Sequence, residues 1–205
     1  MDEPMNEQFN NQPLKDKRVA ILATDGYEQS ELLVPLERLC EAGAKVEVIS
    51  PKSGRIQGFK HFDKAEQVNV DRELSQATAD DYDALVIPGG THNPDQLRVN
   101  PEALSFTRQF FERAKPVGAI CHGPWVLVNA EVVAGRTLTS WPAIRRDIEN
   151  AGGTWVDQAV VVDNGLVSSR KPADLDGFCD KLIAEISEGR HRQAGDLGQR
   201  ESAAQ

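Results

Sequence analysis

The sequence has few cysteines, no long apolar run and no excess of basic residues. Its 205 residues include three cysteines that are odd in number and far apart, so neither a disulfide framework nor a zinc site is predicted. This use of cysteine is typical of a reducing cytoplasm, where we expect the protein to lie. We find no segment with the pattern of a signal peptide, a membrane anchor or a membrane span. A net charge of -9 gives no basic surface for nucleic acid or an anionic membrane.

What remains is a chain that alternates short apolar runs with amphipathic segments. We expect a disordered arm over residues 1–16, one domain over 17–188 and a polar tail over 189–205. Strands are predicted at 18–24, 45–50, 83–88 and 116–120, with a hairpin over 160–169 that turns at Asn-Gly. Helices are predicted around 32–43, 101–115, 142–152 and 175–186. This order predicts an α/β fold with a mostly parallel sheet and helices on both faces.

Ligands of such folds bind beyond the carboxyl ends of the strands, and one strand there runs straight into a cysteine. In the segment Ala119-Ile-Cys-His-Gly-Pro124, Cys121 follows an apolar strand, and a glycine two residues later lets the chain turn into a helix. This is the pattern of a nucleophile elbow, with cysteine in the place of serine. A helix N-terminus would lower the pKa of the thiol. The alternative is a buried core cysteine, which we favour for Cys40 and Cys179 because both lie on apolar helix faces.

A nucleophilic thiol needs proton carriers nearby, and the sequence offers few of them. His122 is the best candidate base among four histidines, although it could be a packing residue. Glu28 follows the first strand and would face the thiol across the sheet edge; the alternative is an acid that favours the helix dipole. The Gly90 amide could form an oxyanion hole with that of His122, or belong to an ordinary glycine turn. Residues 124–189 contain no histidine, which argues against glutamine hydrolysis.

Several of these segments together resemble the ThiJ/PfpI family, especially its intracellular protease I branch. The matching segments are Gly-Tyr-Glu-Gln-Ser-Glu31, Leu85-Val-Ile-Pro-Gly-Gly90, Ala119-Ile-Cys-His-Gly-Pro-Trp125, Asp157-Gln-Ala-Val-Val-Val-Asp163 and Val167-Ser-Ser-Arg170. The resemblance covers about residues 18–187. It implies a flavodoxin-like three-layer sandwich of the class I glutamine amidotransferase type.

The resemblance also implies a role for each matching residue. Cys121 would be the nucleophile with His122 as its neighbour, and Glu28 would be the carboxyl hydrogen-bonded to the sulfur. The amides of Gly90 and His122 would form the oxyanion hole. Asp95 matches a carboxylate that reaches the histidine of an adjacent subunit, although a shorter Asp here could instead be a solvated loop acid. Proteins of this family form dimers or hexamers of dimers and need no metal or organic cofactor.

The family's activities include peptidase, glyoxalase and deglycase reactions and protection against stress, and the motifs do not separate them. We expect a cysteine-dependent enzyme that acts on reactive carbonyls or their early protein adducts. A cysteine peptidase or amidase with the same residues is the second hypothesis. The third is a redox-sensing chaperone in which oxidation of Cys121 is the signal. Small carbonyl compounds, glycated proteins or peptides are the expected partners.

Overall fold

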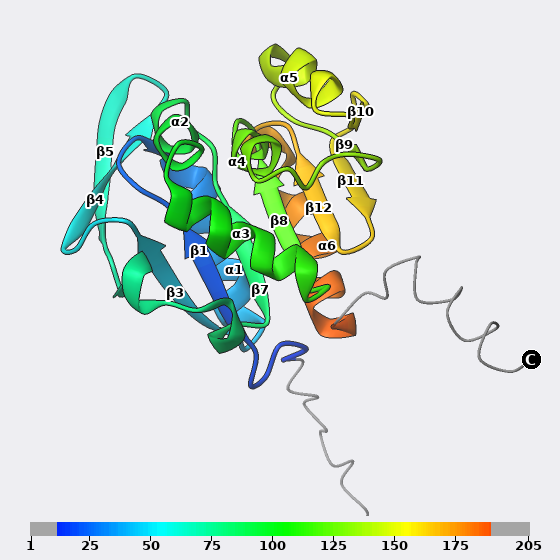
Figure 1. The fold of residues 1–205 in the computed structure, drawn as a ribbon. Helices are drawn as coiled ribbons and strands as arrows, with labels where there is room; N and C mark the ends of the chain where they lie inside the picture. The colour runs from blue at the N-terminus through cyan, green and yellow to red at the C-terminus, as the bar shows by residue number, and fades with distance from the viewer. Residues whose placement is uncertain (1–11, 190–205) are drawn as a thin grey trace, which may run out of the picture.

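The structure, a computed structural model, describes residues 12–189 and is built on a seven-stranded sheet (Figure 1). The order of the strands is β11-β12-β8-β7-β1-β3-β6. All neighbouring pairs are parallel except β11 and β12, which form an antiparallel hairpin. The strands are β1 (Arg18–Leu22), β3 (Lys45–Ser50), β6 (Arg72–Glu73), β7 (Ala84–Ile87), β8 (Val117–Ile120), β11 (Val160–Asp163) and β12 (Leu166–Ser169). The predicted α/β fold with a mostly parallel sheet is therefore confirmed.

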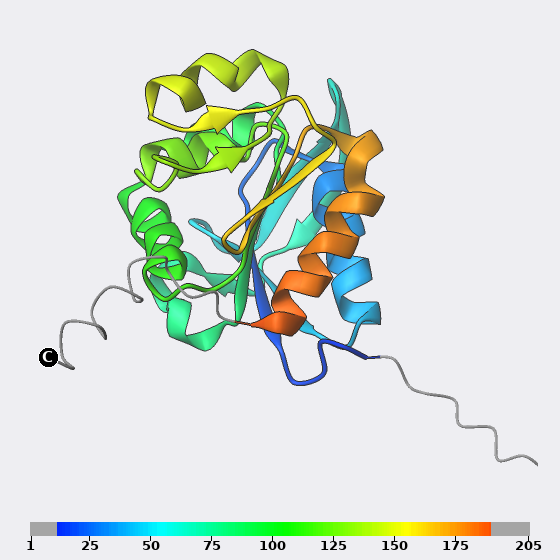
Figure 2. The same ribbon diagram turned by 90° about the vertical axis from the view of Figure 1, so that its right-hand side faces the viewer.

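Helices cover both faces of this sheet (Figure 2). One face carries α1 (Gln29–Glu41) and α6 (Leu175–Glu188). The other carries α2 (His92–Leu97), α3 (Pro101–Glu112), α4 (Pro124–Asn129) and α5 (Arg145–Asn150). Short 3-10 turns join several of these elements; they are η1 (Leu74–Gln76), η2 (Ala79–Asp81), η3 (Pro142–Ile144) and η4 (Pro172–Asp174).

The sheet separates two apolar cores because successive side chains of a strand point to opposite faces. In β1, Ala20 and Leu22 pack with the aromatic residues of α3, such as Phe106, while Val19 and Ile21 pack with the α1 and α6 side. Strands buried on both faces need apolar residues at every position, which is why they read as continuous apolar runs in the sequence.

Two small sheets lie outside the main one. The first joins β2 (Tyr27–Glu28) to a hairpin of β4 (Arg55–Lys60) and β5 (Asp63–Asn69), drawn as a long ribbon in Figure 1. The second pairs β9 (Thr137–Leu138) with β10 (Thr154–Trp155). The β4–β5 hairpin was not predicted: β5 is largely polar and exposed, and in β4 the buried Ile56 is followed by the buried Gly58 rather than by a second apolar side chain.

The structure also corrects three local expectations. Cys40, predicted on a core face, is exposed, whereas Cys179 is buried as predicted. Residues 12–16 are not an arm: Leu14 is fully buried, and its amide donates to the Ala42 carbonyl at 2.9 Å. The segment with Asp95 is the helix α2 rather than a loop. The rest of the predicted arm, 1–11, and nearly all of the predicted tail, 190–205, lie outside the described residues.

Candidate active site

Cys121 lies on a tight turn between β8 and α4, at the carboxyl edge of the sheet. Its φ is +61°, in the left-handed region that non-glycine residues rarely adopt. The amide of Gly123 closes the turn by donating to the Ile120 carbonyl at 2.8 Å. A Cβ atom at Gly123 would lie 2.5 Å from the Ile87 carbonyl oxygen, so only glycine fits there. A strained backbone held this firmly is typical of functional sites.

The strands β8, β7 and β1 are neighbours in the sheet, so the segments that follow them meet around the sulfur. The amides of His122 and Gly90 both form hydrogen bonds to the Cys121 thiol and pull its pKa down. The Nδ1 atom of His122 lies 3.3 Å from the sulfur. Burial lowers the pKa of His122, so the ring is neutral at pH 7 and Nδ1 can accept the thiol proton.

The carboxyl that interacts with the Cys121 thiol belongs to Glu31, not Glu28. Glu31 is fully buried, and its Oε2 accepts the Gly89 amide at 2.9 Å. Its Oε1 is buried with no conventional hydrogen-bond partner within residues 12–189, which makes it free to carry a proton. Burial raises the pKa of Glu31 to about 8, and the nearby charge of Glu28 adds to the rise. Glu31 is therefore mostly protonated at neutral pH.

Glu28 nevertheless lies on the same cavity, one helical turn before Glu31. Its Oε2 accepts the His61 amide at 3.0 Å, which ties the tip of the β4–β5 hairpin to the site. The helix α1 begins at Gln29, so Glu31 falls on its buried face with Leu32 and Pro35. The sequence held a signal for this: Glu31 is an acid at the position where the apolar helix face predicts an apolar residue.

The thiol of Cys121 meets opposing influences on its ionisation. Burial raises its pKa, and an ionised Glu31 would raise it further. The two amide hydrogen bonds act in the opposite direction, and protonated Glu31 removes the like charge. Burial outweighs the two amides, so the pKa of Cys121 is raised above its ordinary value, and the lowering predicted from the helix N-terminus is wrong. The helix α4 has only six residues, so its dipole is weak. Ionisation of the sulfur depends on the amides and on the proton of Glu31.

Two tryptophans hold the ring of His122. Trp141 stacks on it with ring centres 6.1 Å apart, and Trp125 lies 5.1 Å away at a tilt. The guanidinium of Arg98 sits 4.3 Å above the Trp125 ring and forms an ion pair of 2.8 Å with Asp95. Asp95 therefore pairs with Arg98 on the surface, and no contact with His122 is present within residues 12–189 of the single chain.

Asn93, which the sequence analysis did not consider, ties the edge of the sheet together. Its Oδ1 accepts the Thr24 amide at 2.7 Å, and its Nδ2 donates to the carbonyls of Pro88 and Gly89 at 2.9 and 3.2 Å. The Gly89 carbonyl and the Gly90 amide belong to one planar peptide. By holding the carbonyl, Asn93 fixes the direction in which the Gly90 amide points, which is toward the sulfur.

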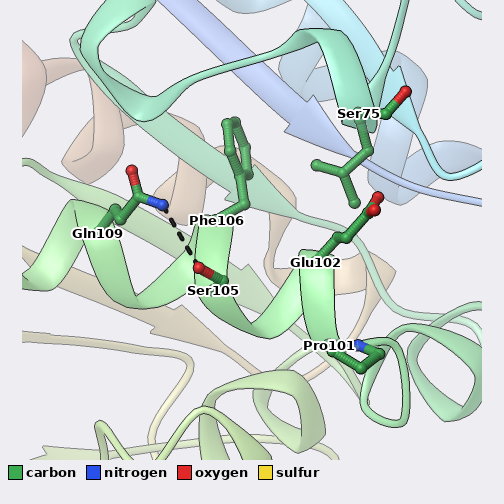
Figure 3. A pocket seen from close by; sticks show the side chains of 7 residues that line it. Ser75, Pro101, Glu102, Ser105, Phe106 and Gln109 are labelled. Atoms are coloured by element: carbon green, nitrogen blue, oxygen red, sulfur yellow. Dashed lines mark hydrogen bonds between the residues drawn. The ribbon is translucent and has the colours of Figure 1, made fainter.

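A cavity of about 480 Å³ opens onto this cluster. Its lining residues are Glu28, Glu31, His61, Phe62, Gly90, Thr91, Cys121, His122, Trp141 and Pro172. A second hollow of about 390 Å³ lies between η1 and α3 (Figure 3). Glu102 is the only ionisable residue that lines it, and no cysteine or histidine does. The cavity at Cys121 is therefore the candidate active site. Among residues 12–189, no group of three or more His, Cys, Asp or Glu residues could hold a metal ion.

Comparison with known proteins agrees with this architecture. The sequence profile of the DJ-1/PfpI family matches residues 17–185. The chain belongs to the DJ-1/PfpI family. The resemblance to the ThiJ/PfpI proteins that was drawn from the motifs is thereby confirmed. None of the helices in residues 12–189 is long and apolar enough to cross a membrane.

Individual proteins match the chain over most of its length. It is 47% identical over 166 residues to a deglycase of Thermococcus kodakarensis, covering 81% of this chain and 97% of that protein. It is 41% identical over 162 residues to a putative cysteine protease of Bacillus subtilis, covering 79% and 94%. A two-domain protein of Anabaena variabilis with DJ-1/ThiJ/PfpI-like and ferritin-like domains superposes with a TM-score of 0.79 at 36% identity. That match covers 83% of this chain and 48% of the longer one.

Replacing Gly90 by alanine tests the role of its amide. Gly90 has a φ of +78°, and an added Cβ would collide with the Gly26 carbonyl and lie 2.7 Å from the Glu28 nitrogen. The loop must shift, so the amide leaves the sulfur. Because hydrogen bonds to charged groups contribute about 1.5–3 kcal/mol, we expect alkylation of Cys121 by iodoacetamide to slow about ten-fold or more. The rate is measured by intact mass, with peptide mapping to separate Cys121 from Cys40.

Gly54→Ala is the matched control for this experiment. Gly54 has nearly the same φ, +81°, but an added Cβ would meet nothing within 4 Å. It therefore introduces the same backbone strain without displacing the site. Equal alkylation rates for the Gly90→Ala variant and the unaltered protein would show that the amide does not stabilise the thiolate.

Proposed function

We propose that this protein is a cysteine-dependent enzyme that acts on reactive carbonyl compounds or their early adducts with amines and thiols. The observation that supports it most is the arrangement at Cys121. A thiol on a strained turn faces two amides, a neutral histidine and a buried, protonated carboxyl. A reducing cytoplasm, where such a thiol would stay reduced, is the compartment that we propose. The deglycase name of the Thermococcus relative favours this reaction class.

Methylglyoxal illustrates the chemistry. The Cys121 sulfur adds to the aldehyde carbon, His122 Nδ1 takes up the thiol proton, and the new alkoxide receives hydrogen bonds from the Gly90 and His122 amides. The proton on the former aldehyde carbon then moves to the neighbouring carbonyl carbon, and the proton held by His122 passes to the oxygen of that carbonyl, which becomes a hydroxyl; the former alkoxide becomes the carbonyl of a lactate thioester on Cys121. Water hydrolyses the thioester and releases lactate and the free thiol. Methylglyoxal plus water equals lactic acid, so no oxidant, reductant or cofactor enters the balance.

Each acid or base near the sulfur has a proposed part in these proton transfers. His122 is within reach of the sulfur, and Glu31 can donate to the thiolate through its unpartnered Oε1. Glu28 lies on the cavity wall, where it can carry a proton between the reacting carbons. The test is release of lactate from methylglyoxal by the protein in an amine-free and thiol-free buffer. Absence of lactate above the buffer background would refute the proposal.

A peptidase is the second candidate, favoured by the Bacillus relative that is named a putative cysteine protease. The same thiol and amides would then form an acyl-enzyme with a peptide. Incubation with peptide esters followed by intact-mass analysis should trap an acyl group on Cys121 and none on the Cys121→Ala variant. A Cys121 that stays unlabelled during ester turnover would exclude this reaction.

We also propose that Asp95 completes the site of a neighbouring subunit in a homodimer or in a hexamer of dimers. Its side chain is half-exposed on α2 and bound to Arg98, so it is available at the surface. A carboxylate beside His122 would favour the protonated ring during proton transfer. We expect Asp95→Asn to keep the fold but lower turnover about ten-fold or more, which corresponds to a loss of about 1.4 kcal/mol or more of transition-state stabilisation.

Mixing the impaired Asp95→Asn variant with an inactive variant tests the shared site directly. Asp95→Asn combined with Cys121→Ala should regain part of the activity, because one interface of a mixed dimer carries an intact Cys121 and an intact Asp95. Analytical ultracentrifugation at the assay concentration reports the assembly state. Full activity of a monomer would rule out a site shared between subunits.

A further inference from the structure

The cavity at Cys121 is divided into a polar base and an apolar mouth. Glu31 is fully buried and Cys121 is 8% exposed, so the reacting groups lie at its base. Phe62 is 98% exposed and Trp141 is 39% exposed, and both line the same cavity, as does Pro172. A carbonyl compound bound at the sulfur therefore shares the cavity with two aromatic side chains. Methylglyoxal carries only a methyl group and would leave the mouth unfilled.

Phe62 is fixed at the tip of the β4–β5 hairpin rather than placed there by chance. His61 before it has a φ of +58°, and its amide donates to Glu28 at 3.0 Å. Midway along the hairpin, the Tyr27 hydroxyl donates to the Glu66 carbonyl at 3.0 Å, and β2 pairs with Gly58 and Phe59 of β4. The turn is thus tied to the site, and the phenyl ring is presented to solvent at its opening.

Trp141 supplies a second aromatic surface on the same cavity. Its amide donates to the Cys121 carbonyl at 2.9 Å, which couples its backbone to the turn of the nucleophile. Its ring stacks on His122 with an interplanar angle of 25°, so one face is occupied. The remaining exposed part, with Phe62, can contact a flat apolar group by stacking or edge-to-face packing.

We propose that this site prefers α-oxoaldehydes, or adducts derived from them, that carry an aryl or similarly large apolar substituent. The proposal rests on the proposed function and names its substrate class. The reactive carbonyl would lie at Cys121 while the substituent lies between Phe62 and Trp141. The carboxyls of Glu28 and Glu31 are the acidic groups on the cavity, and Glu28 disfavours substituents that carry a negative charge. For phenylglyoxal the product would be mandelate, by the same balance as for methylglyoxal.

The test compares kcat/KM for phenylglyoxal and methylglyoxal, measured as initial rates of mandelate and lactate formation. We expect the protein to favour phenylglyoxal about ten-fold, and Phe62→Ala to lower that ratio about five-fold, as one aromatic contact would. Val99→Ala is the matched control, because Val99 is also exposed, at 71%, but does not line the cavity. If the ratio of kcat/KM for phenylglyoxal to that for methylglyoxal is the same in Phe62→Ala as in the unaltered protein, the proposal is overturned. This holds even if sedimentation shows that the variant assembles differently.

A second measurement separates the aryl site from the proposed reaction. Phenacyl bromide and bromoacetone alkylate a thiol by the same displacement of bromide and differ in the aryl group. We expect Cys121 to react faster with phenacyl bromide than with bromoacetone, relative to the rates for free glutathione, and Phe62→Ala to remove that difference. If neither oxoaldehyde is turned over but this dependence on Phe62 appears, the reaction is refuted while the aryl site stands. Equal relative rates for both reagents overturn the aryl site itself.

Discussion

Replacing Cys121 by alanine is expected to reduce lactate formation from methylglyoxal by about 1000-fold or more, down to the buffer background. The substitution removes the sulfur that forms the covalent intermediate, and the remaining amides and His122 cannot replace it. The fold should persist, because alanine fills most of the same buried space at the end of β8. The measurement is the initial rate at matched buffer composition, with urea unfolding of both proteins to confirm that the variant is folded.

Cys40→Ser is the matched control for this experiment. Cys40 is an exposed thiol on α1, outside the cavity, so its loss should leave the rate unchanged. A Cys121→Ala variant that is folded and still forms lactate at the rate of the unaltered protein would show that the reaction does not use the thiol.

Replacing Glu31 by glutamine should change how stability depends on pH. Burial holds the Glu31 pKa at about 8 in the folded protein, against an ordinary value of 4.5. The folded state therefore keeps a proton that the unfolded state loses, and stability falls as the pH rises from about 4.5 to about 8. Glutamine can accept the Gly89 amide and donate toward the sulfur, but it cannot ionise. We expect Glu31→Gln to gain about 3 kcal/mol over the unaltered protein between pH 5.5 and pH 8.

Urea unfolding at several pH values measures this difference, and Glu37→Gln, on the exposed face of the same helix, controls for removal of a carboxyl. The activity gives a second readout. As Glu31 ionises above about pH 8, its charge opposes the thiolate of Cys121, so kcat/KM of the unaltered protein should fall. In Glu31→Gln this decline should disappear. If the free energy of unfolding changes with pH by the same amount in Glu31→Gln and in the unaltered protein, Glu31 is not protonated in the folded state.

The central sheet could be predicted from the sequence because each of its main strands is recognisable from its own short apolar run. Runs such as Ala84–Ile87 and Val117–Ile120 are apolar at every position, and only strands covered on both faces require that. The β4–β5 hairpin escaped prediction because few of its residues are apolar and buried, Ile56 among them, and much of its support comes from pairing and from its ties to Tyr27 and Glu28. Its tip brings His61 and Phe62 to a cavity whose other lining residues, such as Cys121, lie far from them in the sequence.

The sequence predicted which segments of the chain form the site, but not which side chain of each segment contacts the sulfur. Strand order places Cys121, Gly90 and the start of α1 together, as the parallel sheet requires. Which acid of the pair Glu28 and Glu31 meets the sulfur depends on where α1 begins, and helix starts are the least certain part of a sequence-based prediction. The contact of Asp95 with His122 stays a prediction, because the proposed partner belongs to another chain.

The central claim is that the Cys121 sulfur forms a covalent bond to the carbonyl carbon of its substrate. Rapid quenching of the protein during turnover of methylglyoxal, followed by intact-mass analysis with and without hydroxylamine, tests it most directly. The account predicts an increase equal to one methylglyoxal molecule that maps to Cys121, disappears with hydroxylamine as a thioester does, and is absent from Cys121→Ala. Adducts that resist hydroxylamine and occur equally on Cys121→Ala, while lactate is still being formed by the unaltered protein, would contradict it.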